Sequence, residues 1–78
     1  MKVQITAYGI ARDIAGRSFE LEVEGATVRD LRTALLLAYP PLASLKSLMV
    51  AVNENYAGDD ALINPEDVVV LIPPVSGG

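Results

Sequence analysis

The residues best suited to chemistry in this 78-residue sequence are the last six, Pro73-Pro74-Val75-Ser76-Gly77-Gly78. Two prolines stop sheet pairing and favour an extended path, so the apolar strand before them should continue as a stiff arm. Two terminal glycines give the slimmest backbone and let atoms of another protein approach the terminal carboxylate from any side. A frayed terminus without function is the alternative, and the double proline favours a functional arm.

The reactive group of this arm would be the free carboxylate of Gly78. A carboxylate is a poor electrophile at neutral pH, so another protein must first activate it, for example with ATP as an acyl-adenylate. Attack by sulfide then gives a thiocarboxylate, whereas attack by an amine gives an amide, as in protein tagging. The residues support the arm and leave the nucleophile open.

Composition excludes most other chemistry within the chain. Because cysteine and histidine are absent, the sequence offers no thiolate nucleophile, no imidazole base and no zinc site with the usual ligands. Its serines have no such base to activate them, and neither a phosphate-binding loop nor a dinucleotide fingerprint is present. We therefore expect a chain that is not an enzyme on its own and that binds no metal and no cofactor.

The charge balance and the apolar pattern limit the partners. Six basic residues against ten acidic ones give a net charge of −4, which disfavours nucleic-acid binding. Every apolar run is shorter than the ~20 residues of a membrane span, and the polar alternation that follows Met1 does not resemble a signal peptide. We expect a single soluble domain in the cytoplasm that binds no membrane.

Two segments alternate as half-buried strands do. Residues 2–8 place Val3, Ile5 and Ala7 on one face, and residues 18–24 place Phe19, Leu21 and Val23 inward. Residues 9–16 read as a connection with two glycines, so the strands should form an antiparallel hairpin. The three glutamates that alternate with the second apolar set could bind a cation, but a solvated sheet face is the favoured interpretation.

The sequence predicts one main helix after Gly25-Ala26. Thr27 has the side chain of an N-cap, and Asp30 follows at the position of a capping-box acid. Apolar residues then recur at helical spacing until Pro40-Pro41 ends the helix: Val28, Leu31, Ala34, Leu35 and Ala38. Leu36 and Leu37 would widen this stripe, which predicts a helix seated deeply on a sheet. A surface for a partner helix is the alternative.

The second half of the chain predicts short elements that end in a buried strand. Leu42, Leu45 and Leu48 fit a turn of helix, residues 49–52 a strand, residues 53–55 a turn, and Tyr56 returns to extended structure. Gly58-Asp59-Asp60 is expected to be a solvated turn rather than a calcium loop, and residues 64–67 another turn. Residues 68–72 are continuously apolar, which predicts a central strand buried on both faces beside the first strand.

This order of elements predicts an α+β fold of the β-grasp (ubiquitin-like) type. One main helix would cross one face of a mixed sheet, with right-handed crossovers. The domain would span residues 1–72, and residues 73–78 would form a flexible C-terminal Gly-Gly tail. The fold alone says nothing about chemistry.

The sequence also resembles, over nearly its whole length, the small-subunit family of molybdopterin synthase, whose members are ubiquitin-like sulfur carriers. The matching stretches are Tyr8 to Gly16 after the first strand, Thr27 to Arg32 at the helix start, Ala51-Val52-Asn53, and Glu66-Asp67-Val68 followed by an apolar strand and the six-residue ending. A terminal Gly-Gly is shared by all ubiquitin-like carriers. The complete Pro-Pro-Val-Ser-Gly-Gly ending is more specific.

The resemblance implies a sulfur-carrying role without catalysis by this chain. An adenylyltransferase of the ubiquitin-activating type would use ATP on Gly78, whose carboxylate becomes a thiocarboxylate. The arm would then enter the large, catalytic subunit of molybdopterin synthase, in a heterotetramer, and deliver sulfur to cyclic pyranopterin monophosphate. Tyr8, Tyr56 and Ile72 match positions at which the family contacts its partner. The strand phase also places Tyr8 on the face away from the helix, which suits an interface anchor, with an isolated surface tyrosine as the alternative.

Three other functions stay open. The same arm could join this chain to lysines of other proteins, as a protein modifier does. It could carry sulfur for another pathway of the thiamine type, although that carrier is usually shorter and lacks the double proline. The chain could also be an interaction domain with an inert tail.

Overall fold

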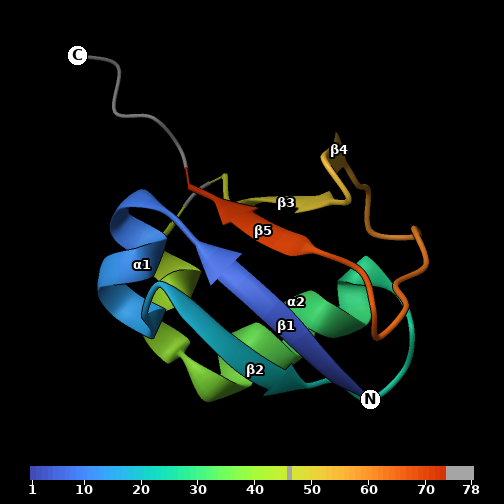
Figure 1. The fold of residues 1–78 in the computed structure, drawn as a ribbon. Helices are drawn as coiled ribbons and strands as arrows, with labels where there is room; N and C mark the ends of the chain where they lie inside the picture. The colour runs from blue at the N-terminus through green and yellow to red at the C-terminus, as the bar shows by residue number, and fades with distance from the viewer. Residues whose placement is uncertain (46, 74–78) are drawn as a thin grey trace.

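The computed structural model describes residues 1–45 and 47–73 (Figure 1). Its elements are β1 (Lys2–Ala7), α1 (Gly9–Ala15), β2 (Ser18–Glu22), α2 (Val28–Ala38), the 3₁₀ helix η1 (Pro40–Ser44), β3 (Met49–Val52), β4 (Asn55–Tyr56) and β5 (Val69–Ile72). Of the predicted tail, only Pro73 is within the described residues. Pro74, Val75, Ser76, Gly77 and Gly78 lie outside them.

The five strands form one mixed sheet in the order β2-β1-β5-β3-β4. β1 pairs with β2 in an antiparallel way and with β5 in a parallel way, and β3 is antiparallel to both β5 and β4. The last strand therefore lies at the centre beside the first, as predicted. The helices gather behind the sheet in the view of Figure 1 and leave its other face open. This arrangement is the β-grasp fold that the sequence predicts.

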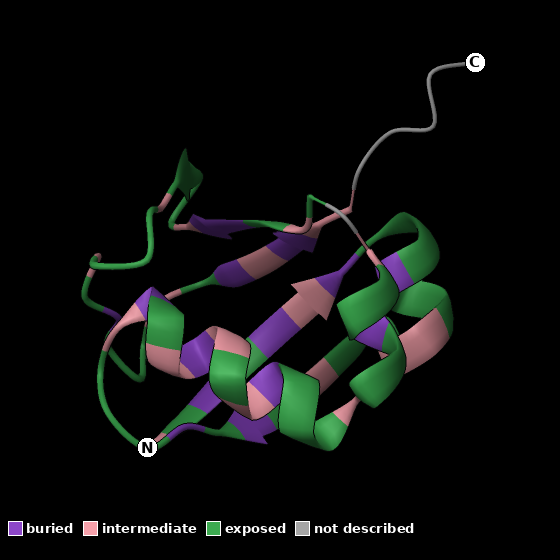
Figure 2. Cartoon of the chain, turned by 180° about the vertical axis from the view of Figure 1, so that it is seen from behind, coloured by how far each residue is buried: buried purple, intermediate pink, exposed green. Residues whose placement is uncertain are grey.

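The core lies between the sheet and the helices. The inward positions of β1 and β2 are the predicted ones, because Val3, Ile5 and Ala7 are fully buried and Leu21 is nearly so. Helix α2 adds the buried residues Val28, Leu31 and Leu35. Figure 2 shows buried segments both on this helix and on the strands that it covers. Burial of such a shared apolar layer is the main force that holds the helix on the sheet.

Residues 9–15 form helix α1, so the prediction of an irregular connection there is wrong. Gly9 and Gly16 flank the helix, and both have positive φ angles, 56° and 99°. Between them Ala11 is buried and Ile14 is half-buried, three residues apart on one side of the helix. The glycines therefore mark the two ends of a helix too short for its periodicity to stand out.

The start of α2 is as predicted, but its apolar stripe is narrower. Thr27 Oγ1 accepts a hydrogen bond from the Asp30 backbone N–H at 3.2 Å, and Asp30 Oδ2 accepts one from the Thr27 backbone N–H at 3.2 Å. Leu36 is 43% exposed and Leu37 is 79% exposed, so the expectation that they widen the buried face is wrong. At 100° per residue they fall outside the arc that Leu31 and Leu35 present to the sheet.

Pro40 and Pro41 end α2 as predicted, and they also begin η1. A proline has no N–H to lose in the first turn of a helix, so both rings fit there. Leu42 lies in this turn and is buried against the core. Leu45 and Leu48 follow the turn and are half-buried, so of the three leucines predicted to share a turn of helix only Leu42 lies within it.

The central strand β5 is buried on one face rather than on both. Val69 and Leu71 have no exposed surface, but the alternate residues Val70 and Ile72 are only half-buried, and Val68 before them is 59% exposed. The apolar run of β5 therefore has two causes. Val69 and Leu71 are apolar because they fill the core, and Val70 and Ile72 are apolar because they belong to an uncovered apolar surface.

Candidate functional site

The open face of the sheet is the surface on which the structure places the predicted partner-contact residues. Strand side chains alternate between faces, so Val70 and Ile72 point away from the helices. The register sets Ala51 of β3 beside Val70, and Met49 beside Ile72. Tyr56 of β4 pairs with Ala51 and extends the same surface by one strand.

These side chains surround one hollow of about 300 Å³. The lining residues come from the end of β1, from the β3–β4 hairpin and from β5: Tyr8, Ala51, Glu54, Tyr56, Val70 and Ile72. Tyr8 is 52% exposed and Tyr56 is 68% exposed, which is a large apolar area for side chains of a small domain to leave in water. The structure thus brings Tyr8, Tyr56 and Ile72 together, and their role in partner binding stays a prediction.

The other half of the open face is polar. The pairs across β1 and β2 on this side are Lys2 with Glu22, Gln4 with Glu20, and Thr6 with Ser18. Gln4 Nε2 donates to Ser18 Oγ at 2.8 Å, which fixes one of these pairs. A partner that buries apolar surface would therefore sit over β5, β3 and β4 rather than over β2.

Asn53 fastens the hairpin that carries Tyr56, a role that the sequence analysis missed. Its Nδ2 donates to Asp67 Oδ1 at 2.9 Å, and its Oδ1 accepts from the Val68 N–H at 2.9 Å. The Asn64 backbone N–H and the Asn53 amide, both donating to this carboxylate, lower the pKa of Asp67. The available signal was the turn-forming types of Asn53 and Asn64. These residue types predict a turn at each position but not the contact between the two turns.

The turn of this hairpin is also unusual in its backbone. Asn53 and Glu54 have φ angles of 50° and 71°, and of the residues in the described ranges other than glycine only these two are positive. Two left-handed residues give a type I′ turn, which usually has glycine in the second position. The positive φ angle of Glu54 is energetically unfavourable for a residue with a side chain, and this conformation places the Glu54 carboxylate at the rim of the hollow.

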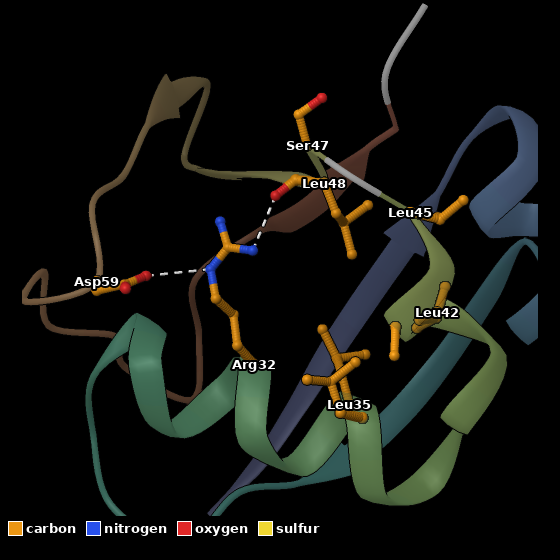
Figure 3. A pocket seen from close by; sticks show the side chains of 9 residues that line it. Arg32, Leu35, Leu42, Leu45, Ser47, Leu48 and Asp59 are labelled. Atoms are coloured by element: carbon orange, nitrogen blue, oxygen red, sulfur yellow. Dashed lines mark hydrogen bonds and ion pairs between the residues drawn. The ribbon is translucent and has the colours of Figure 1, made fainter.

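A larger hollow, of about 460 Å³, lies between α2, η1 and the start of β3 (Figure 3). Arg32 crosses one side of it. Its Nε donates to Asp59 Oδ1 at 3.1 Å, and one terminal nitrogen donates to the Leu48 carbonyl at 2.8 Å. None of the predicted site residues lines this hollow. The Arg32 guanidinium is already hydrogen-bonded to Asp59 and Leu48, so we interpret its role here as structural: it holds α2 against the neighbouring segments.

The open face offers an apolar docking surface. Its hollow is lined by two phenols, one carboxylate and three aliphatic side chains, and among these described residues no nucleophile lies beside a base. Within residues 1–45 and 47–73, no three carboxylates cluster closely enough to hold a metal ion. In the same ranges no helix has the length and apolar character to cross a membrane. Docking next to the root of the tail is what this geometry supports.

Comparison with known proteins places the chain in a family. A family model described as the ThiS family matches residues 5–78. A molybdopterin synthase sulfur carrier subunit from Chlamydomonas reinhardtii is 33% identical, and the match covers all of both chains. One from Arabidopsis thaliana is 31% identical over all of this chain and 84% of its own length.

Solved structures agree on the fold. SAMP1 from Haloferax volcanii superposes with a TM-score of 0.83 at 29% identity over the whole of both chains. A putative molybdopterin converting factor subunit 1 from Pyrococcus furiosus gives 0.84 at 29% identity, covering 96% of this chain and 99% of its own. A complex of subunits 1 and 2 of the molybdopterin-converting factor from Helicobacter pylori gives 0.67 at 25% identity, covering all of both chains.

The fold thus defines a small ubiquitin-like protein of the β-grasp class. The chain belongs to the ThiS family, and its predicted resemblance to molybdopterin synthase sulfur carriers is confirmed.

Proposed function

We propose that this chain is the sulfur-carrying small subunit of a molybdopterin synthase. The observation that carries the proposal is the coincidence of the relatives' function with an uncovered apolar hollow beside Pro73, the root of the tail. The large catalytic subunit docks on Tyr8, Tyr56 and Ile72, and the arm enters its active site. The Helicobacter pylori proteins, described as a complex of subunits 1 and 2, support a partner of this kind.

The chemistry proceeds at Gly78 in three steps. The carboxylate oxygen attacks the α-phosphorus of ATP on a ubiquitin-activating-type adenylyltransferase, and pyrophosphate leaves. Sulfide then attacks the acyl carbon and AMP leaves, which gives the thiocarboxylate. In the synthase its sulfur displaces an oxygen substituent from a carbon of cyclic pyranopterin monophosphate, so that the C–O bond breaks as the C–S bond forms. Water then cleaves the acyl–sulfur bond, which restores the carboxylate and leaves the sulfur on the pterin.

In this proposal the partner proteins supply most of the chemistry. The activating enzyme consumes ATP, and this chain binds no cofactor. The product, molybdopterin, carries a dithiolene, which contains two sulfur atoms. Two loaded carriers therefore act per product, which suits a heterotetramer of two large and two small subunits in the cytoplasm. We assign the acid–base chemistry to the partners.

The decisive experiment removes Gly78 or adds one residue after it. We expect both variants to lose molybdopterin formation completely, since the terminal carboxylate is then displaced from the position where it reacts. Binding of the large subunit should persist, because Tyr8, Tyr56 and Ile72 are unchanged, and circular dichroism should show the same fold. Undiminished molybdopterin formation by the shortened chain would refute the proposal.

A second function, protein modification, is favoured by one observation. SAMP1 from Haloferax volcanii, a small archaeal modifier protein, is as similar in fold as the converting-factor subunit. The two functions share adenylation and differ in the nucleophile that follows. Mass spectrometry of the intact chain from its native host separates them. A thiocarboxylate replaces one oxygen by sulfur, whereas a modifier appears in conjugates with lysines of larger proteins.

A further inference from the structure

The root of the predicted tail rests on the backbone between β1 and α1. The parallel register pairs Ala7 with Leu71, and the Tyr8 N–H continues the pairing by donating to the Leu71 carbonyl at 3.3 Å. Gly9 comes next, as the first residue of α1, and Pro73 lies two residues beyond Leu71. The strand that ends in the tail and the strand that ends in α1 therefore leave the sheet side by side.

Gly9 and Pro73 are closer than a residue with a side chain permits. A β-carbon built on Gly9 would lie 2.9 Å from Pro73 Cγ and 3.9 Å from Pro73 Cδ. Carbon atoms in favourable contact are about 3.5–4.0 Å apart, so the first distance is a clash. The φ angle of Gly9 is also 56°, which disfavours other residues. The half-buried proline ring thus lies over a bare α-carbon.

The neighbours of this contact connect it to the docking surface. Tyr8, directly before Gly9, lines the open-face hollow, and so does Ile72, directly before Pro73. One short segment therefore holds both a docking side chain and the surface on which the tail root rests. Any shift of Pro73 away from Gly9 changes where the arm starts relative to the docked partner.

We propose that Gly9 is a positioning residue for sulfur transfer, an inference that rests on the proposed function. Its missing side chain seats Pro73 and so fixes the exit point of the arm relative to the hollow formed by Tyr8, Tyr56 and Ile72. Docking depends on the hollow and is largely independent of Gly9. Delivery of the arm's end depends on both.

The test uses the full chain as a chemically prepared thiocarboxylate, which makes the adenylation step unnecessary. Gly9→Ala is compared with Gly16→Ala, the matched control. Gly16 also has a positive φ, 99°, but a β-carbon there meets nothing within 4 Å. Both substitutions strain the backbone at an end of α1, and only one contacts Pro73. Titration calorimetry with the large subunit gives Kd, and single-turnover molybdopterin formation gives the transfer rate.

We expect Gly9→Ala to lower the transfer rate about tenfold to a hundredfold, the scale of a displacement near 1 Å, while Kd changes little. Gly16→Ala should leave both close to wild type. In a Pro73→Ala background, adding Gly9→Ala should have little further effect, because the clashing ring is gone. A backbone-strain effect would persist in that background, so persistence overturns the proposal, as do equal rates for Gly9→Ala and Gly16→Ala.

A measurement on the free chain separates failure of this inference from failure of the proposed function. Nuclear Overhauser contacts between the Gly9 α-protons and the Pro73 ring should be present in wild type and in Gly16→Ala. In Gly9→Ala the ring should move away from residue 9, so that the contacts with its α-proton weaken. If the wild-type chain transfers no sulfur, the proposed function fails. The contact between Gly9 and Pro73 is then still tested independently by these nuclear Overhauser measurements. Absence of these contacts from wild type overturns the inference.

Discussion

The guanidinium of Arg32 lies 3.1 Å from the carboxylate of Asp59, and this pair joins helix α2 to the segment after β4. Arg32 also donates to the Leu48 carbonyl at 2.8 Å, so one side chain connects three parts of the chain (Figure 3). The predicted solvated turn at Asp59 and Asp60 is confirmed, since both residues lie in a turn and are exposed. Both carboxylates also pair with arginines of α2, Asp59 with Arg32 and Asp60 with Arg29 at 3.1 Å each.

Arg32→Gln should lower the free energy of unfolding by about 1–2 kcal/mol, since it removes a charge-assisted hydrogen bond and a bond to a backbone carbonyl. Arg29→Gln is the matched control on the same helix. The side chains of its ion pair are 63% and 90% exposed, so its loss should stay within about 0.5 kcal/mol. Urea denaturation of both variants measures the difference, and equal losses would contradict it.

The capping box of α2 predicts a loss of stability in acid. The Thr27 backbone N–H and then the Thr27 hydroxyl lower the pKa of Asp30 below its usual value of 3.8. A carboxyl group with a lowered folded-state pKa stabilises the fold above its unfolded-state pKa, and this contribution disappears as the pH falls through the folded-state value. The lowered pKa of Asp67 acts in the same direction.

We therefore expect Tm to be steady near neutral pH and to fall below about pH 4. Asp30→Asn should lower Tm at pH 7, and its deficit relative to wild type should shrink as the pH is lowered. Thermal unfolding followed between pH 7 and pH 2 measures both curves. Thr33→Ala, in the same helix but away from the cap, should run parallel to wild type throughout. A deficit of Asp30→Asn that is constant with pH would argue against the assignment.

Tyr8→Glu should weaken binding of the large subunit about tenfold to a hundredfold, because it places a charge in an apolar contact. Leu62→Glu is the matched control. It makes the same kind of change at a 72% exposed apolar residue on a different part of the surface, and its affinity should equal that of wild type. Calorimetry provides both values. An unchanged affinity for Tyr8→Glu would place Tyr8 outside the contact.

Glu54→Gly should raise the free energy of unfolding by about 1 kcal/mol, because glycine tolerates the φ angle of 71° that glutamate adopts in the hairpin. Glu66→Gly serves as the control, since Glu66 lies in a turn but does not have a positive φ. That change should give no gain. Chemical denaturation of the two variants provides the comparison, and a loss at position 54 would mean that the glutamate side chain stabilises the turn.

Much of the fold follows from local sequence signals. Thr27 and Asp30 mark the start of α2 because their side chains and the first N–H groups are close in sequence. Pro40 and Pro41 mark its end because of their covalent structure. The alternation in β1 and β2 identifies the buried face of each strand. Helix α1 was missed because a helix of seven residues, which begins at Gly9 and ends before Gly16, carries too little periodicity to be distinguished from a loop.

The candidate site depends on contacts that no local signal contains. Tyr8, Tyr56 and Ile72 are brought together by the pairing of β5 with β1 and β3, which joins residues far apart in sequence. Resemblance to a family indicated these positions, whereas periodicity indicated only the outward phase of Tyr8. Asn53, Glu54 and Val70 could be recognised as part of the site only once the register was known.

The central place of β5 also has a mechanical consequence. β5 is held by three residue pairs to β1 and by four to β3. Because β1 and β5 are parallel, tension between the start of β1 and the end of β5 shears all of their hydrogen bonds at once instead of opening them one after another. Pro73 directly follows this strand, which is held on both sides. A pull on the chain beyond Ile72 is therefore shared between β1 and β3.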